Sequence, residues 1–322
     1  PYVPGLFFGT QALFQEKTEW KNLGLVIIDE QHRFGVSQKA ALVGKGNSPH
    51  LLVMSATPIP RSLALTAYGE LDLTRLNGRI PGRKPVRTCL LEKRDLKGLF
   101  RRVREEVASG GQVLWVCPLL EERVPRKAVP VRERFQCIQK ELPDLPSGWI
   151  HGKMAPHEKE EAVRRFENGE TKILVSTTVV EVGIDLPGAT VIVVENAECF
   201  GLSQLHQLRG RVGRGQREGA CVLLVPSRSE GTVERLSVFL QTTDGFALAE
   251  ADLRLRGPGA LCGVRQHGVT EFKLADPSRD RILLERAREE AGRLRPEDGL
   301  LSFSSWVCAD PGEALTGIPF LG

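Results

Sequence analysis

The chain has 322 residues, of which 41% are hydrophobic and 26% charged, and its formal net charge is +4. No apolar run approaches the length of a membrane-spanning helix, and the first residues form no charged-then-apolar leader, so we expect neither membrane insertion nor secretion. The seven cysteines include no C-x-x-C pair, which favours reduced thiols in a cytoplasm over disulfides or zinc sites. The small positive charge permits a nucleic-acid partner without requiring one.

Short apolar runs alternate with segments of helical periodicity, which is typical of α/β proteins with parallel sheets. Strands are predicted at residues 24–28, 51–54, 112–117, 172–176, 190–194 and 221–225. Crossover helices are predicted at residues 94–109 and 156–168. After residue 227 the strands stop. Residues 230–241 and 244–254 are predicted to form a helical hairpin, and residues 280–294 a further charged helix.

Residues 77–87 (NGRIPGRKPVR) contain two prolines and two glycines and are predicted to form a linker. Two strands precede this segment, too few for a complete doubly wound sheet, whereas the four strands after it suffice for one domain. We therefore expect tandem α/β domains, the first incomplete at residues 1–76 and the second at residues 88–228. The hairpin and the last helix occupy residues 229–295, and residues 296–322 form an unassigned tail.

Two acidic residues, Asp29 and Glu30, directly follow the first predicted strand in LVIIDEQHRFG. Ligands of a parallel sheet bind beyond the carboxyl ends of its strands. There Asp29 can hold the magnesium ion of a nucleoside triphosphate, and Glu30 can orient the attacking water. The alternative is a pair of solvated acids, which Gln31 and His32 in the same run make less attractive.

Small hydroxyl side chains follow the next strand, in MSATPIPR. Ser55 and Thr57 can bond to the neighbouring acidic loop and transmit its state. Taken alone, this run is equally compatible with an ordinary strand-to-turn transition.

A third loop, VSTTVVEVGIDLPGA, leaves the strand predicted at residues 172–176. Thr177 and Thr178 offer hydroxyls to a nucleic-acid backbone, and Asp185 can accept a hydrogen bond from a ribose hydroxyl. A solvated loop is the alternative. His151, which follows GWI, is interpreted as a strand-end residue near a phosphate backbone, although a lone histidine is more often structural.

The run QLHQLRGRVGRGQR carries four arginines spaced by glycines. Arg211 and Arg214 are three residues apart, which on one helix face would let both reach a terminal phosphate as arginine fingers. In phosphoryl transfer such a finger contributes roughly 10³–10⁵ in rate. A basic helix that touches a phosphate backbone is the alternative, and the two roles can coexist.

In this order and spacing, DEQH, SAT, TTVVEVGIDLPGA and QLHQLRGRVGR resemble helicase motifs II, III, V and VI of superfamily 2. TTDGFALAEADLRLRGPGALCGVRQHG, residues 242–268, resembles the translocation motif of the RecG family of ATP-dependent DNA helicases, which remodel branched DNA. The related transcription-repair coupling factors share much of this tail, but Gln31, Pro258 and Arg265 favour the RecG family. The resemblance covers residues 9 to 294.

The resemblance implies tandem RecA-like motor domains, ATP and Mg²⁺ as cofactors, and duplex or branched DNA as partner. It implies these roles for residues of this chain: catalysis for Asp29, Glu30, His32, Arg211 and Arg214; nucleotide binding for Gly183, Asp185 and Gln207; coupling for Gln31, Ser55, Thr57, Arg235, Arg256 and Gln266; and DNA binding for Gly9, Thr10, His151, Thr177 and Thr178. Gly9 and Thr10 belong to GTQAL, where the family usually has GTHAL, so Gln11 is a departure.

The sequence contains no G-x-x-x-x-G-K-[ST] phosphate loop. We therefore expect a C-terminal fragment without the phosphate loop and the N-terminal wedge domain of the family, inactive as an ATPase by itself. The intact protein is expected to be a monomer in a bacterial cytoplasm, at the nucleoid. Alternatives are a translocase of the transcription-repair coupling type, a DNA-binding fragment that does not hydrolyse ATP, and an RNA helicase.

Overall fold

The computed structural model describes residues 5–14, 22–30, 41–46, 48–55, 84–118, 129–177, 188–215, 217–256 and 281–293, with the single positions 18, 20, 72, 74, 76 and 186. The chain divides into two compact units, one of residues 1–61 and 74–268 and one of residues 62–73 and 269–322. Within the second unit lies helix α10 (Arg281–Arg293), close to the helix predicted at residues 280–294.

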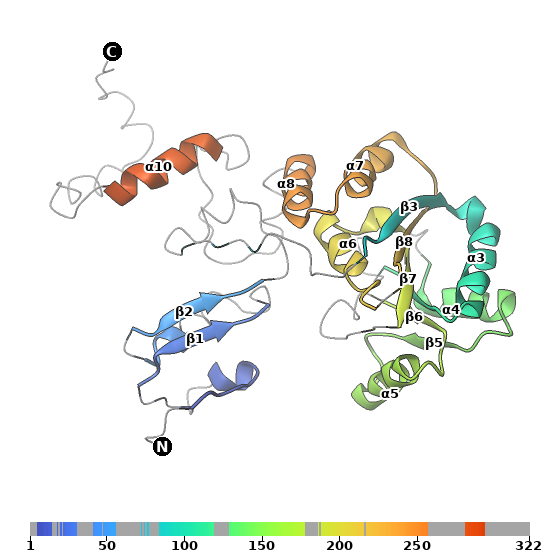
Figure 1. Ribbon diagram of the computed structural model, residues 1–322, viewed down its shortest axis with the longest axis horizontal. Helices are drawn as coiled ribbons and strands as arrows, with labels where there is room; N and C mark the ends of the chain where they lie inside the picture. The colour runs from blue at the N-terminus through green and yellow to red at the C-terminus, as the bar shows by residue number, and fades with distance from the viewer. Residues whose placement is uncertain are drawn as a thin grey trace, which may run out of the picture. The chain divides into compact units, whose positions relative to one another are not determined.

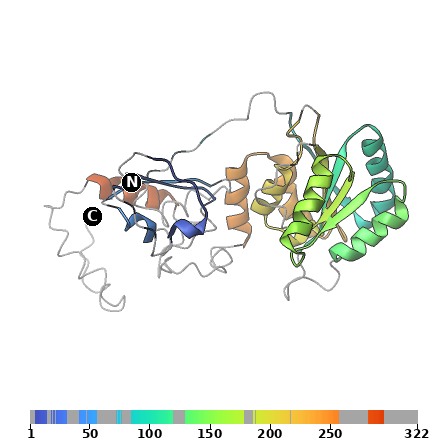
Figure 2. The ribbon, with the colours of Figure 1, turned by 90° about the horizontal axis from the view of Figure 1, so that it is seen from below.

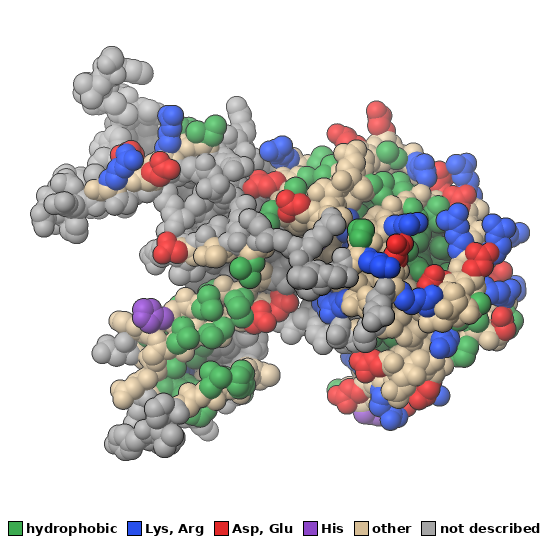
Figure 3. All heavy atoms as spheres, in the orientation of Figure 1, with side chains coloured by type: hydrophobic (Ala, Val, Ile, Leu, Met, Phe, Trp, Pro, Cys, Tyr) green, Lys and Arg blue, Asp and Glu red, His purple; other side chains and the backbone are tan. Residues whose placement is uncertain are grey.

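A two-stranded parallel sheet lies near the N-terminus (Figure 1) and follows a 3-10 turn, η1 (Gln11–Phe14). Its strands are β1 (Leu25–Ile28) and β2 (His50–Val53). Val26 and Ile28 are buried against Leu42 on one face. On the other face, hydrophobic side chains of both strands remain about half exposed (Figure 3). Strands of parallel sheets are normally covered on both faces; among the described residues, the covered face of this sheet is the one that carries Val26 and Ile28.

The second sheet has six strands in the order β3-β8-β7-β4-β6-β5, and every pairing is parallel. Its strands are β3 (Arg87–Glu92), β4 (Gln112–Val116), β5 (Ser147–Ile150), β6 (Ile173–Ser176), β7 (Ala189–Glu195) and β8 (Ala220–Val225). Helices α3 (Leu96–Ala108) and α4 (Val131–Glu141) cover one face, and α5 (Pro156–Glu167) and α6 (Leu202–Arg209) the other (Figures 1 and 2). Two further 3-10 turns are η3 (Lys93–Asp95) and η5 (Ala197–Cys199). The predicted α/β class with parallel sheets is confirmed.

Two strands of this sheet, β3 and β5, are absent from the sequence prediction, which has four strands here instead of six. Both lie at the edges of the sheet. Their residues are mostly half-buried, whereas β4 and β6 are buried at every position. Because an edge strand needs no continuous apolar run, RTCLLE and SGWI lack the pattern that identifies the central strands. Arg87, placed in the linker by the sequence, is the first residue of β3.

The predicted helical hairpin is formed by α7 (Glu230–Gln241) and α8 (Gly245–Arg256). The carboxylate of Asp244 accepts a hydrogen bond from the backbone N–H of Phe246 (2.9 Å) and so begins α8. Leu236 and Phe239 of α7 and Leu248 of α8 are buried in the core beside α6. The hairpin is therefore packed onto the face of the six-stranded sheet that carries α6.

A buried ion pair lies at the carboxyl end of β7. Glu195 accepts hydrogen bonds from Arg134 of α4, one of them from Nε at 2.6 Å, and from Nε1 of Trp115 on β4 at 2.9 Å. Both charged side chains are at most 5% exposed. Burial pulls the pKa of Arg134 down, but the hydrogen bond and charge of Glu195 outweigh it and leave that pKa raised. The pair thus ties α4 to the centre of the sheet.

Replacing Glu195 by Gln should lower the free energy of unfolding by about 3 kcal/mol, because removing one charge leaves Arg134 buried without its counter-ion. The matched control is Asp144→Asn, whose partner Arg104 lies 2.7 Å away with both side chains half exposed. An exposed pair of this kind contributes less than about 1 kcal/mol. Urea denaturation of both variants checks the difference, and equal effects would contradict it.

Candidate functional site

The predicted acidic loop lies where two strands of the N-terminal sheet end together. Ile28 is paired with Val53, and the N–H of Met54 donates to the carbonyl of Ile28 (2.7 Å). Asp29 therefore follows β1 at the same edge at which Ser55 follows β2. Ligands of parallel sheets bind at this edge, so the structure gives both side chains the position that the sequence predicts.

Glu30 has a left-handed backbone, with φ of +50°. A non-glycine residue in this region carries a conformational cost, and such residues cluster at functional sites. The carboxylate of Asp29 accepts a hydrogen bond from the N–H of Glu30 (2.7 Å), which supports the turn. The strand thus ends in a tight bend at Asp29 and Glu30.

The carboxylates at the end of β1 show whether a magnesium ion could be held there. Within the described ranges, no group of three or more His, Cys, Asp or Glu side chains could hold a metal by itself. Magnesium bound with a nucleotide needs only one or two protein carboxylates, because phosphates and waters complete its shell. Asp29 is exposed, and one of its oxygens accepts a bond from Glu30. It therefore fits the single-carboxylate role predicted for it.

Several predicted site residues lie outside the described residues. These are Gln31, His32, Thr57, Thr178, Gly183, Asp185 and Gln266, together with the side chain of Arg256. Their assigned roles stay predictions.

Two predicted DNA contacts follow neighbouring strands of the large sheet. Ile150 of β5 is paired with Ser176 of β6, so His151 and Thr177 leave the same edge. Nδ1 of His151 accepts a hydrogen bond from the N–H of Lys153 (3.2 Å). Thr177 is 2% exposed, and within the described part of the chain neither its hydroxyl nor that of Ser176 has a hydrogen-bond partner. The edge therefore holds two buried hydroxyls with spare hydrogen-bonding capacity.

Gly9 and Thr10, the other predicted DNA contacts, are exposed and lead into η1. The carbonyl of Thr10 accepts a hydrogen bond from the N–H of Leu13 (3.0 Å). A side chain at Gly9 would start 2.7 Å from Leu13. The absence of a side chain at Gly9 therefore permits this close turn.

The sequence prediction of Arg211 and Arg214 on one helix face is wrong. Helix α6 ends at Arg209, and both residues lie beyond it. Gly213 has φ of +68° and its N–H donates to the carbonyl of Ala189 (3.3 Å), which brings the chain to the amino end of β7. A glycine at such a φ turns the chain where a helix would continue. We call residues 210–219 the arginine loop, of which Gln216 is not described.

Arg214 is exposed, and its Nε donates to the carbonyl of Gly210 (3.1 Å), whereas Arg211 is half-buried. Gln207, predicted to contact the nucleotide, lies half-buried on α6, one turn before the arginine loop. The two predicted fingers are thus presented by a loop that follows a rigid helix.

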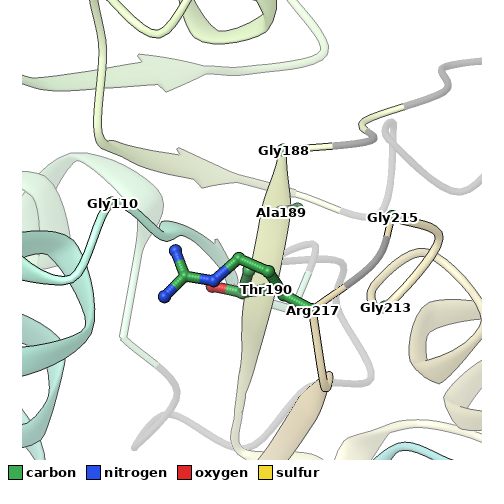
Figure 4. A pocket seen from close by; sticks show the side chains of 7 residues that line it. All are labelled: Gly110, Gly188, Ala189, Thr190, Gly213, Gly215 and Arg217. Carbon is green, nitrogen blue, oxygen red and sulfur yellow. The ribbon is translucent and has the colours of Figure 1, made fainter. Parts of the chain in front are cut away.

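A cavity of about 230 Å³ lies between the arginine loop, the end of α3 and the start of β7 (Figure 4). It is lined by Gly110, Gly188, Ala189, Thr190, Gly213, Gly215 and Arg217. Gly188 belongs to the predicted loop GIDLPGA and approaches Gln112 closely, since a Cβ there would lie 1.9 Å from Oε1 of Gln112. Gln112 in turn donates to the carbonyls of Phe166 (2.5 Å) and Thr171 (2.9 Å).

Arginines from two helices join α6 to the hairpin. Arg209 of α6 is 4% exposed, and its Nη1 donates to the carbonyl of Phe239 on α7 (3.0 Å). Its guanidinium lies 4.1 Å from the centre of the Phe239 ring. Burial lowers the pKa of Arg209, and the carbonyl and the ring offset part of that cost.

In the opposite direction, Arg235 of α7 donates to the carbonyls of Phe200 (2.7 Å) and Glu198 (2.7 Å), just before α6. Arg235 was assigned to coupling by resemblance, and it occupies the junction between the hairpin and the helix that leads to the arginine loop. The buried residues Arg209, Arg134 and Glu195 were missed. The one sequence signal for Arg209 is its place among the core leucines of LSQLHQLR, with Leu205 and Leu208 buried.

Comparison with known proteins gives matches over most of the chain. The family model of the helicase conserved C-terminal domain matches residues 96–216, and that of the C-terminal part of domain 3 of the ATP-dependent DNA helicase RecG matches residues 242–303. The RecG helicase of Thermotoga maritima is 51% identical over 290 residues, which are 90% of this chain. The chain belongs to the RecG family.

RecG of Escherichia coli K12 is 42% identical over 311 residues, which cover 94% of this chain. A structure of RecG bound to a three-way DNA junction matches 86% of the chain with a TM-score of 0.65 and 48% identity. The chain spans 37% of the Thermotoga RecG, 45% of the Escherichia RecG and 35% of the RecG chain in that structure. Among the described helices, none is long and apolar enough to cross a membrane.

Replacing Gly188 by Ala should lower the free energy of unfolding by about 1–3 kcal/mol, because the new methyl group must displace the Gln112 amide from its bonds. Gly98→Ala is the matched control: Gly98 lies on α3 with nothing within 4 Å of a Cβ. That change should raise the free energy of unfolding by about 0.5–1 kcal/mol. Chemical denaturation measures both, and effects of the same sign would refute the packing argument.

Proposed function

We propose that this chain is the C-terminal motor part of an ATP-dependent DNA translocase that remodels branched DNA in recombination and repair. The observation that carries the proposal is the match to RecG over nine tenths of the chain. The RecG structure bound to a three-way DNA junction supports branched DNA as the substrate. The acidic strand end, the arginine loop and the hairpin junction would supply three of the parts that such a motor needs.

Hydrolysis would use the carboxylates at the end of β1 and the arginines of the arginine loop. A bound magnesium ion would neutralise phosphate charge, and Asp29 is the residue that would hold it. Glu30 would orient the attacking water, with His32 beside it. Arg211 and Arg214 would stabilise the charge that develops on the terminal phosphate. Gly183, Asp185 and Gln207 would contact the nucleotide.

Coupling would run from the arginine loop through α6 to the hairpin. Arg209 of α6 bonds to α7, and Arg235 of α7 bonds to the segment just before α6, so a shift of α6 would be transmitted to α7. Packed side chains with buried hydrogen bonds transmit such displacements because they resist gradual deformation. Arg256 and Gln266 would continue the path beyond α8. In the first domain, Gln31, Ser55 and Thr57 would link the acidic loop to the second strand.

DNA would be held mainly through its phosphates. Gly9 and Thr10 in the first domain and His151, Thr177 and Thr178 in the second are the proposed contacts. Aromatic residues make up only 6% of the chain, which argues against recognition by base stacking.

The finger role is tested in a protein that contains this chain together with a phosphate-binding loop. Arg214→Ala should lower kcat for DNA-stimulated ATP hydrolysis by about 10³, because a finger acts on the transition state. Affinity for forked DNA should stay within about threefold. Arg164→Ala, in an exposed pair with Glu161 on α5, is the control.

An unchanged ATPase rate in Arg214→Ala would remove this residue from the finger role. The 322-residue chain alone should show no DNA-stimulated ATPase. Turnover by the chain that disappears on Glu30→Gln would contradict that expectation.

Binding to forked DNA should weaken linearly in a plot of log affinity against log salt concentration, because cations released from phosphates drive it. Lys153 is exposed in the turn that follows β5, next to His151. Lys153→Ala should reduce the slope by about 1 if it contacts a phosphate. Lys140→Ala on α4 serves as control. Fluorescence anisotropy measures the slopes, and an affinity independent of salt would exclude binding through phosphates.

A further inference from the structure

We propose that Arg217 is a positioning residue that fastens the arginine loop to the C-terminal end of α3 and so holds Arg211 and Arg214 in one arrangement. The inference rests on the proposed function of those two arginines. Arg217 itself touches neither nucleotide nor DNA in this proposal. It acts by restricting the loop that carries the fingers.

The contacts of Arg217 all lead to the end of α3. Its Nη2 donates to the hydroxyl of Ser109 (2.8 Å) and lies 4.0 Å from Oε1 of Glu106. Its Nη1 lies 3.5 Å from the place a Cβ would take on Gly110. Figure 4 shows the side chain extending across the cavity toward Gly110. A cation at this end of a helix also interacts favourably with the helix dipole.

Glu106, the α3 residue that lies near Arg217, is itself hydrogen-bonded to the sheet. Oε1 of Glu106 accepts a hydrogen bond from the hydroxyl of Thr190 on β7 (2.7 Å). The N–H of Gly111 donates to the carbonyl of Glu106 (2.9 Å), and a Cβ on Gly111 would lie 2.3 Å from the Glu106 carboxylate. The carboxylate therefore packs directly against the backbone of Gly111. Arg217 joins the arginine loop to a point shared by α3 and β7.

The loop needs such a tie because of its composition. Gly210, Gly213, Gly215 and Gly219 give its backbone many accessible conformations. A second ion pair of the loop, Arg87 with Glu218 (3.1 Å), has side chains 81% and 53% exposed. Exposed pairs of that kind contribute little. Arg217 and Glu106 are 45% and 30% exposed, and the Ser109 hydroxyl and the helix end add to their interaction.

The first experiment follows ATP hydrolysis in a protein that carries this chain with a phosphate-binding loop. Arg217→Ala should lower kcat about tenfold and leave KM for ATP within twofold, because misplaced fingers cost transition-state stabilisation rather than binding. Arg217→Lys keeps the positive charge at the helix end and should recover most of the rate. Glu106→Gln combined with Ser109→Ala should lower kcat similarly and add little to Arg217→Ala.

The second experiment observes the loop in the 322-residue chain. Trypsin cleavage after Arg211 and after Arg214, followed by mass spectrometry, should become at least fivefold faster in Arg217→Ala. Arg164→Ala is the matched control, since its exposed pair with Glu161 lies on α5, and it should leave both cleavage rates unchanged.

The outcomes separate this inference from the proposed function. If Arg214→Ala lowers kcat while Arg217→Ala leaves kcat and cleavage unchanged, the positioning role is overturned and the fingers stand. If Arg214→Ala leaves kcat unchanged, the finger assignment fails. The rate of trypsin cleavage in Arg217→Ala then tests by itself whether Arg217 holds the arginine loop to α3. Should Arg217→Ala fail to fold, the Glu106→Gln, Ser109→Ala variant decides by the same two measurements.

Discussion

Two arginines, the buried Arg134 and the half-buried Arg235, fix the segment that runs from β7 to α6, and the position of the arginine loop depends on them. Arg134 reaches Glu195 from α4, and Arg235 reaches the backbone of residues 198 and 200 from α7. Arg209 then returns from α6 to α7. Burying a guanidinium is costly unless every contact is satisfied. Each arginine therefore permits little variation in the path of the chain.

The same arrangement explains how the parts of the domain are connected. The β7 strand ends in the buried ion pair, and α6 follows after the short turn η5. The arginine loop begins at the far end of α6 and returns to the amino end of β7. The hairpin is attached to both ends of α6 through Arg235 and Arg209. The arginine loop and the hairpin are thus both joined to α6 or to the segment just before it.

The sequence predicts the parts of this domain that depend on local patterns. Central strands such as β4 and β6 are apolar throughout, and α7 begins and ends at the predicted residues 230 and 241. The edge strands β3 and β5 are missed by the sequence prediction because each has only one neighbouring strand and is mostly half-buried, so it lacks a continuous apolar run. Asp29 and Ser55 lie at one edge of the sheet because β1 and β2 are parallel neighbours whose carboxyl ends are paired.

Other features depend on partners that are distant in the sequence. Helix α6 ends at Arg209, so the helix face predicted for Arg211 and Arg214 does not exist. The chain then turns at Gly213, whose N–H bonds to the distant Ala189. Arginine is usually a surface residue, and the burial of Arg134 requires Glu195, which lies 61 residues further along the chain. No local pattern carries that information.

The junction made by Arg235 has a consequence for sequence drift. Its acceptors are main-chain carbonyls, which every amino acid provides. A change of side chain at position 198, which is only half-buried, removes no acceptor as long as the backbone keeps its path. Side chains at the positions that provide the acceptor carbonyls can therefore change among relatives without loss of these hydrogen bonds. Arg235 itself cannot be replaced in this way, because no other side chain has the same planar set of donors.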